Sequence, residues 1–192
     1  MNAKVVTASV ELKKVYSILA EDVEEARTYG QTNPSGFAHR SLFRATFALI
    51  EGLSFQFRSV SLACAAAMPQ LLTTAEVSLL KEEKYKLDNK GTPKASADFQ
   101  KLLPNIFFSM RCYAKVHGAT FEPDTKNHGY ESMQKFVSIR NGLEHPKSAS
   151  NLENSDEDLR HAMEAVMWWK NEVFRLLQAC DEADEYWKGR LA

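Results

Sequence analysis

The sequence feature that most constrains the fold is a three-and-four spacing of apolar residues through most of the chain. Near the N-terminus this spacing runs from Val5 to Ala26. Near the C-terminus the same spacing extends over more than about five turns, at Leu159, Met163, Val166, Trp169, Val173, Leu177 and Cys180. Such a period lines one face of an α-helix. No segment shows the alternation of a strand between turns, so we expect an all-α fold, a helical bundle without strands.

Turn-forming residues divide this pattern into separate helices. Asn33–Gly36 and Asn89–Pro93 contain the glycine, proline and asparagine that interrupt helices. We expect helices over about 4–29, 37–68, 75–89, 96–113 and 129–143, and a long one from 156. The helix from Ser96 carries Phe99 on its apolar face and is kinked at Pro104. Residues 117–128 lack periodicity and are expected to form a surface loop.

Composition places the chain among ordinary globular proteins. It has 192 residues, 44% of them apolar and 26% charged, which predicts a single domain over residues 1–192. The net charge is −1, and residues 151–192 hold ten acidic against five basic side chains. The overall charge therefore does not indicate a nucleic-acid binder, and contact with RNA needs a local basic patch.

The apolar and cysteine-containing segments indicate the compartment. The longest uncharged run, residues 59–75, is interrupted by Pro69 and is shorter than the roughly 20 residues of a membrane helix. Cys64, Cys112 and Cys180 lie far apart without a Cys-x-x-Cys pair, which indicates buried free thiols. With no apolar signal segment at the N-terminus, we expect a soluble cytoplasmic protein that does not contact a membrane.

Several kinds of site are excluded by missing motifs. The chain has no Gly-rich phosphate loop, no His-Glu-x-x-His, no Gly-x-Ser-x-Gly and no paired cysteines at zinc spacing. We therefore expect no metal and no cofactor. His39, His117, His128 and His161 have no partners at ligand spacing and are expected to be surface or capping residues without a functional role.

The segment richest in chemically active groups is Arg140-Asn141-Gly142-Leu143-Glu144-His145, followed by Pro146, Lys147 and Ser148. Gly142 and Pro146 indicate that a helix ends here. On a continuing helix Arg140 and His145 lie about 140° apart around the axis, so they meet only if the helix ends or a second chain completes the site. Alternatively, both residues only stabilise the negative end of their own helix.

Two acidic residues bear on this segment. Glu144 repels phosphate unless it is paired, and Arg140 or Lys147 are the expected partners. Glu51 lies on a polar stripe of the 37–68 helix with Arg40, Arg44 and Arg58, because residues seven apart return to nearly the same face. This stripe is either a solvated edge with ion pairs or the wall of a polar cleft, in which Glu51 is a possible supporting group.

An Arg, a polar residue, three intervening residues and a His within an all-helical chain resemble the HEPN superfamily of helical ribonuclease and nucleic-acid-binding domains, whose signature is Arg-x4–6-His. Arg140, Asn141 and His145 match this signature, and the resemblance covers about residues 37–180. It implies a HEPN-like four-helix core with additional helices. It also implies an active site formed where two domains pair in a homodimer, and cleavage that leaves a 2′,3′-cyclic phosphate.

The chemistry of these side chains suits RNA cleavage without a metal. His145 is the expected general base or acid, Arg140 the stabiliser of the transition state, and Asn141, Lys147 and Ser148 are expected to contact substrate. We therefore expect an endoribonuclease acting on RNA, tRNA included, of toxin or anti-phage type, with a possible inhibitory or activating protein partner. The alternatives are a non-catalytic HEPN-like domain that binds RNA or protein, and a structural adaptor that oligomerises through its final helix.

Overall fold

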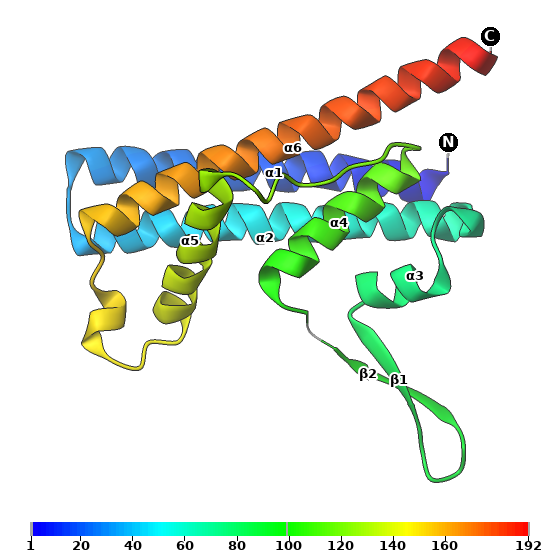
Figure 1. The fold of residues 1–192 in the computed structure, drawn as a ribbon, viewed down its shortest axis with the longest axis horizontal. Helices are drawn as coiled ribbons and strands as arrows, with labels where there is room; N and C mark the ends of the chain where they lie inside the picture. Colours follow the sequence, from blue (N-terminus) through cyan, green and yellow to red (C-terminus); the bar gives the residue numbers. More distant parts are fainter. Residues whose placement is uncertain (1, 99, 192) are drawn as a thin grey trace. The chain divides into compact units, whose positions relative to one another are not determined.

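The structure is a computed structural model that describes residues 2–98 and 100–191, with side chains described up to residue 186. The helices are α1 (Ala3–Thr32), α2 (Gly36–Ala67), α3 (Thr74–Leu80), α4 (Leu102–Val116), α5 (His128–Glu144) and α6 (Asp156–Leu191), as Figure 1 shows. Two short 3-10 helices, η1 (Pro69–Leu71) and η2 (Ala149–Leu152), and two strands, β1 (Glu83–Leu87) and β2 (Pro93–Ala97), complete the described chain. The expected helical bundle is confirmed at this level, because the chain is mostly helical with bundle-like packing.

The antiparallel hairpin of β1 and β2 contradicts the expectation of a chain without strands. The expected helix over 75–89 ends at Leu80, because Glu82 adopts a positive φ of 53° that no helix accommodates. A turn then reverses the chain: the Asp88 carboxylate accepts hydrogen bonds from the backbone N–H groups of Lys90 and Thr92, and Gly91 has φ 75°. The N-cap at Thr73 agrees with a helix start here, but the residues after Leu80 alternate between polar and apolar as in a strand.

The helix expected from Ser96 begins only at Leu102, because Ser96 belongs to β2. Pro104 therefore lies in the first turn of α4, where its missing N–H removes no helical hydrogen bond. Phe99, expected on this helix, lies outside the described residues. The other expected helices are confirmed with shifts of a few residues at their ends.

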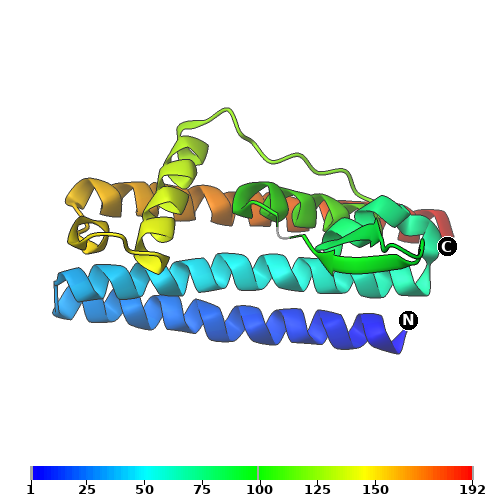
Figure 2. The ribbon, with the colours of Figure 1, turned by 90° about the horizontal axis from the view of Figure 1, so that it is seen from below.

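The described chain forms two compact units, and α1, α2 and α6 each contribute a segment to both. Unit 1 consists of Met1–Leu12, Ser54–Glu122 and Gln178–Ala192, and unit 2 of Lys13–Leu53 and Pro123–Leu177. In both units α1 and α2 lie side by side and antiparallel (Figure 2). The single domain over 1–192 stays a prediction. No helix among the described residues is long and apolar enough to cross a membrane.

The core of unit 1 joins α2, α3 and α4. Buried Ala65, Leu72, Leu80 and Cys112 pack together. The N-terminus of α3 has a capping box between Thr73 and Glu76, which satisfies N–H groups that the first helical turn leaves free. All three cysteines of the chain are buried and free, as expected. Burial raises the pKa of the Cys112 and Cys180 thiols to about 12, so neither is a ready nucleophile at neutral pH.

The core of unit 2 fixes α5 against α2 and α6. The ring of Phe136 is fully buried and lies 4.4 Å from the ring of Phe47 and 5.2 Å from that of Phe43, centroid to centroid. At the other end of α5, Gly129 lies so close to Trp168 that a Cβ atom there would be 2.6 Å from the Trp168 Cβ. The Trp168 indole also donates to the Asp124 carbonyl oxygen at 2.9 Å. These contacts hold the helix that carries the Arg140 segment.

Candidate active site at the end of helix α5

The helix α5 ends within the Arg140–His145 segment, which is one of the two arrangements that the sequence allowed. Its last residue is Glu144, and His145 is the C-cap with φ −130° and ψ 60°. The His145 N–H still donates to the Asn141 carbonyl oxygen at 3.1 Å. The side chain of His145 therefore leaves a backbone that is no longer helical, and the angle of about 140° from Arg140 no longer applies.

The side chain of Arg140 lies beside Glu51 of α2. Its Nη2 atom is 2.8 Å from Glu51 Oε1, and the two side chains are 27% and 38% exposed. Glu51 Oε1 is buried and accepts no hydrogen bond, so its contact with Arg140 is an ion pair only. Arg140 Nη1 also donates to Asn141 Oδ1 at 3.3 Å. Three of the expected site residues are thus in contact within unit 2.

Glu144 is paired, but neither with Arg140 nor with Lys147 as expected. Arg44 of α2 places its Nε atom 3.8 Å from Glu144 Oε1, and Arg44 Nη2 is 3.5 Å from the Leu143 carbonyl oxygen. One helical turn away, Arg40 donates to the Leu152 carbonyl oxygen at 2.9 Å. The polar stripe of α2 therefore faces the end of α5 and the segment that follows it. Its remaining member, Arg58, belongs to unit 1.

The side chain of His145 is exposed and makes no hydrogen bond or ion pair within the described part of the chain. Lys147 and Ser148 are exposed as well, and their backbone N–H groups both donate to Asn151 Oδ1, at 3.0 and 3.2 Å. The Ser148 hydroxyl also bonds within this loop, to Asn151 and Ser150. Asn151, which no sequence motif indicates, organises the loop beside Gly142.

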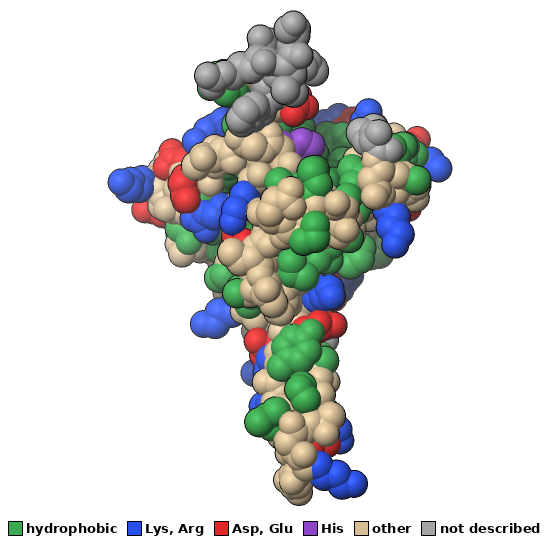
Figure 3. Space-filling view, turned by 90° about the vertical axis from the view of Figure 1, so that its right-hand side faces the viewer, with side chains coloured by type: hydrophobic (Ala, Val, Ile, Leu, Met, Phe, Trp, Pro, Cys, Tyr) green, Lys and Arg blue, Asp and Glu red, His purple; other side chains and the backbone are tan. Residues whose placement is uncertain are grey.

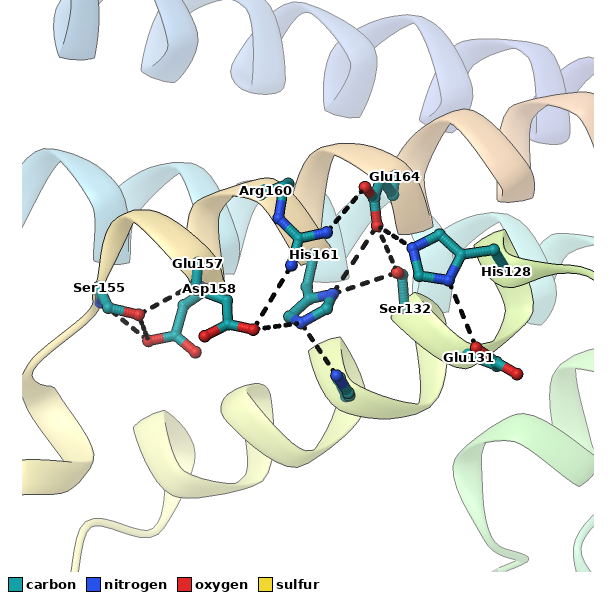
Figure 4. A network of polar contacts seen from close by, with 10 residues as sticks. His128, Glu131, Ser132, Ser155, Glu157, Asp158, Arg160, His161 and Glu164 are labelled. Atoms are coloured by element: carbon teal, nitrogen blue, oxygen red, sulfur yellow. Dashed lines mark hydrogen bonds and ion pairs between the residues drawn. The ribbon is translucent and has the colours of Figure 1, made fainter.

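A second polar cluster joins α5 to α6 and involves two of the histidines that were expected to stand alone (Figure 4). His161 is buried, with 4% of its surface exposed, and contacts Ser132 Oγ through Nδ1 at 3.2 Å. His128 Nε2 lies 3.1 Å from Glu164 Oε2. Ser132 donates to the same Glu164 oxygen at 2.6 Å. His128 is exposed, as expected, although it is ion-paired, whereas the expectation that His161 is a surface or capping residue is wrong.

The partners of this cluster determine the direction of its hydrogen bonds. Lys135 Nζ lies 3.1 Å from His161 Nε2, and an ammonium group only donates. Nε2 is then the acceptor, Nδ1–H donates to Ser132, and Ser132 donates to the Glu164 carboxylate. Because Ser132 is fully buried and its proton faces a carboxylate, this arrangement suits a structural link and not an activated nucleophile.

His117 is also not a surface residue. It caps α4, its ring lies 4.6 Å from the ring of Tyr113, and its Nε2 atom is buried without a hydrogen-bond partner in the described chain. Burial lowers the pKa of the His117 imidazole. The capping role expected for His117 is confirmed, and the surface position is not. His39 is half-buried on α2.

The Ser132 hydroxyl influences how the stability of the protein depends on pH. Its hydrogen bond is the main cause that lowers the pKa of the Glu164 carboxyl below 4.5. A folded-state pKa below the unfolded one stabilises the protein above pH 4.5, and this stability is lost as the pH falls through the folded value. The variant Ser132→Ala is expected to lose less stability than the wild type between pH 7 and pH 3, measured by urea unfolding.

The matched control is Ser109→Ala, because Ser109 is equally buried but donates to the Asn105 carbonyl oxygen, which does not titrate. Its acid-induced loss of stability is expected to equal that of the wild type. An equal loss for Ser132→Ala as well would contradict the role of this hydroxyl.

Comparison of the chain with family models, with curated proteins and with solved structures gives no match. Among the residues that the structure describes, no group of three or more His, Cys, Asp or Glu side chains is placed to hold a metal ion. Only the residues and distances at the end of α5 therefore bear on what this site does.

Proposed function

We propose that this chain is a metal-independent endoribonuclease of the HEPN-like type, with RNA, tRNA included, as its substrate. The observation that carries the proposal is the end of α5. There an exposed His145, unpaired among the described residues, follows Arg140 and Asn141 by one helical turn. Imidazole exchanges protons near neutral pH, and a guanidinium neutralises the charge that develops on a phosphate under attack.

In the proposed reaction a histidine removes the proton of the RNA 2′-hydroxyl, and the 2′-oxygen attacks the adjacent phosphorus. The bond to the 5′-oxygen breaks, and this leaving oxygen takes a proton from a general acid. The products are a 2′,3′-cyclic phosphate and a 5′-hydroxyl. Arg140 stabilises the pentacoordinate phosphorus, Asn141 orients the phosphate or His145, and Lys147 and Ser148 bind neighbouring phosphates.

The proposed active form is a homodimer. One imidazole cannot be both base and acid in the same step, and two copies of the chain supply two. A dimer also brings a second guanidinium to the phosphate. The proposal further includes a toxin or anti-phage role, with a protein partner that inhibits or activates cleavage.

The second candidate is a non-catalytic HEPN-like domain that binds RNA or a protein. The ion pair between Arg140 and Glu51 favours it, because Glu51 already neutralises the guanidinium that would contact phosphate. Glu144 adds a second carboxylate nearby. This candidate predicts that the end of α5 contributes to binding and that no RNA is cleaved.

The test is incubation of the purified chain with RNA in excess EDTA, with the ends of the products determined chemically. We expect cleavage that leaves 2′,3′-cyclic phosphate and 5′-hydroxyl ends. Intact RNA, or cleavage that EDTA abolishes, contradicts the proposal. Intact RNA that stays bound to the chain supports the second candidate instead.

A further inference from the structure

The packing of the described chain does not explain the hairpin of β1 and β2. Its register pairs Glu83 with Ala97 and Leu87 with Pro93. All residues of both strands except Glu83 are exposed. A two-stranded hairpin alone is only marginally stable in water. Figure 1 shows the hairpin extending away from α3 and α4, and Figure 3 shows hydrophobic and basic side chains along it.

One face of the hairpin presents lysines. In the antiparallel register Lys84 lies opposite Ser96, and Lys86 lies directly opposite Lys94. Like charges in directly opposed positions repel and destabilise a hairpin. Asp98 offsets Lys84 at 2.7 Å and Asp88 offsets Lys94 at 3.4 Å, while no ion pair of Lys86 is found in the described chain. Asp98 also attracts Lys86 without forming an ion pair, and the exposed lysine face stays open to an external anion.

The opposite face presents an aromatic and an aliphatic side chain. Tyr85 is 57% and Leu87 is 71% exposed, and their cross-strand neighbours Ala95 and Pro93 are small. The Tyr85 hydroxyl donates to Glu83 Oε2 at 2.9 Å, which holds the phenol at its tip and leaves the ring open. An exposed ring of this kind is a surface on which a nucleic-acid base can stack.

The hairpin is firmly connected at its base. The Asp98 N–H donates to the Glu82 carbonyl oxygen at 2.7 Å, which joins the two ends of the hairpin. The Glu82 carboxylate receives Arg58 Nη1 at 2.7 Å and Asn105 Nδ2 at 2.8 Å, and the Arg58 and Glu82 side chains are only 14% and 22% exposed. The ribbon is therefore presented in a defined direction by α2 and α4 of unit 1.

We propose that this hairpin is an RNA-binding arm, with a single-stranded RNA lying along the free edge of β1. Successive residues of a strand point to opposite faces, so an RNA at this edge meets Lys84 and Lys86 on one side and the Tyr85 ring on the other. The lysines bind phosphates, and the ring stacks on a base. The choice of RNA rests on the proposed function.

A single-stranded nucleic acid fits these observations better than a protein partner does. Three lysines on one face of the hairpin suit an anion with repeated charges, and the alternation of lysine, tyrosine and lysine matches a chain in which phosphates and bases lie on different sides. A protein that covers only the apolar face leaves the repulsion between Lys86 and Lys94 in place.

The binding test uses a fluorescent single-stranded 2′-O-methyl RNA, which lacks the nucleophile and cannot be cleaved, and measures anisotropy at several salt concentrations. The triple variant Lys84→Gln/Lys86→Gln/Lys94→Gln is expected to bind at least tenfold more weakly. Because three lysines no longer neutralise phosphates, the slope of log affinity against log salt is expected to fall by about 2. Tyr85→Ser is expected to weaken binding several-fold without changing this slope.

Two controls match these variants. Lys4→Gln/Lys13→Gln/Lys14→Gln removes the same charge from exposed positions on α1, and Tyr16→Ser removes an exposed tyrosine from the same helix. Both are expected to bind as the wild type does.

A further variant replaces residues 83–97 by a short Gly-Ser turn between Glu82 and Asp98, whose backbones are already hydrogen-bonded. It removes the whole arm, Tyr85 included, and is expected to bind more weakly than the triple lysine variant.

The outcomes separate this inference from the proposed function. If the wild type cleaves unmodified RNA but the hairpin variants bind 2′-O-methyl RNA normally, the inference fails and the ribonuclease stands. If the hairpin variants lose binding but the wild type cleaves nothing, the inference stands and the ribonuclease fails. Normal RNA binding combined with a smaller molecular mass for Tyr85→Ser in light scattering identifies the hairpin as a protein contact and overturns the inference.

Discussion

The variant His145→Ala is expected to cleave RNA at least 100-fold more slowly than the wild type, with unchanged helical content and thermal stability. Proton transfer by a positioned side chain contributes about 10²–10⁴-fold to catalysis, and alanine removes that group entirely. The side chain of His145 is exposed and makes no polar contact within the described chain, so its loss leaves the fold intact. Initial rates on a labelled RNA in EDTA provide the measurement.

The control for this variant is His39→Ala, the same substitution at a half-buried position of α2 outside the segment. It is expected to retain wild-type activity. Arg140→Ala is expected to behave like His145→Ala, because the guanidinium acts on the same phosphate. Equal cleavage by the wild type and His145→Ala would falsify the assignment of this histidine and show that the nuclease activity lies elsewhere or in a contaminant.

The largest effect on stability is expected for Phe136→Ala, which should lower the free energy of unfolding by about 3–5 kcal/mol. The Phe136 ring is fully buried between α5 and α2 and packs against Phe43 and Phe47. Removing it loses the transfer free energy of the ring and leaves a cavity that its neighbours fill only in part. Urea unfolding followed by circular dichroism measures the change.

The matched control is Phe174→Ala on α6, where the ring is 68% exposed. Its effect is expected to stay within about 0.5 kcal/mol, because little buried surface is lost. A loss below about 1 kcal/mol for Phe136→Ala would show that the contact between α5 and α2 is not a core contact. Because α5 carries Arg140 and His145, Phe136→Ala is also expected to inactivate the protein at lower temperature than the wild type.

Local sequence signals were sufficient for the helices and for the end of α5. The spacing of apolar residues determines which face of a helix can be buried, and this depends on the sequence alone. The residues expected to line the inner face of α1, from Val5 to Ala26, are all partly buried. Pro146 correctly indicated a helix end within the Arg140–His145 segment, because the residue before a proline is disfavoured in the helical conformation, whereas Gly142 lies inside α5 and does not end it.

The hairpin was not predicted because its two strands are short and almost fully exposed. The alternation of polar and apolar residues covers only Lys84 to Leu87, and a run rich in lysine and glutamate also suits an exposed helix, so this short alternation did not distinguish the two. Asp88 and Gly91 decided the outcome by forming the turn, together with Glu82, which ends the preceding helical segment. The prediction of an all-helical chain was wrong here for this reason.

The sequence by itself thus determined the helical elements and the residues available for chemistry at the end of α5. Only the tertiary structure decided which of them are in contact: Glu51 with Arg140, Arg44 with Glu144, and His161 with Ser132. The physical reason is that each of these contacts joins residues of different helices. Periodicity places a residue on a helix face, but the packing of buried rings such as Phe136 decides which two faces meet.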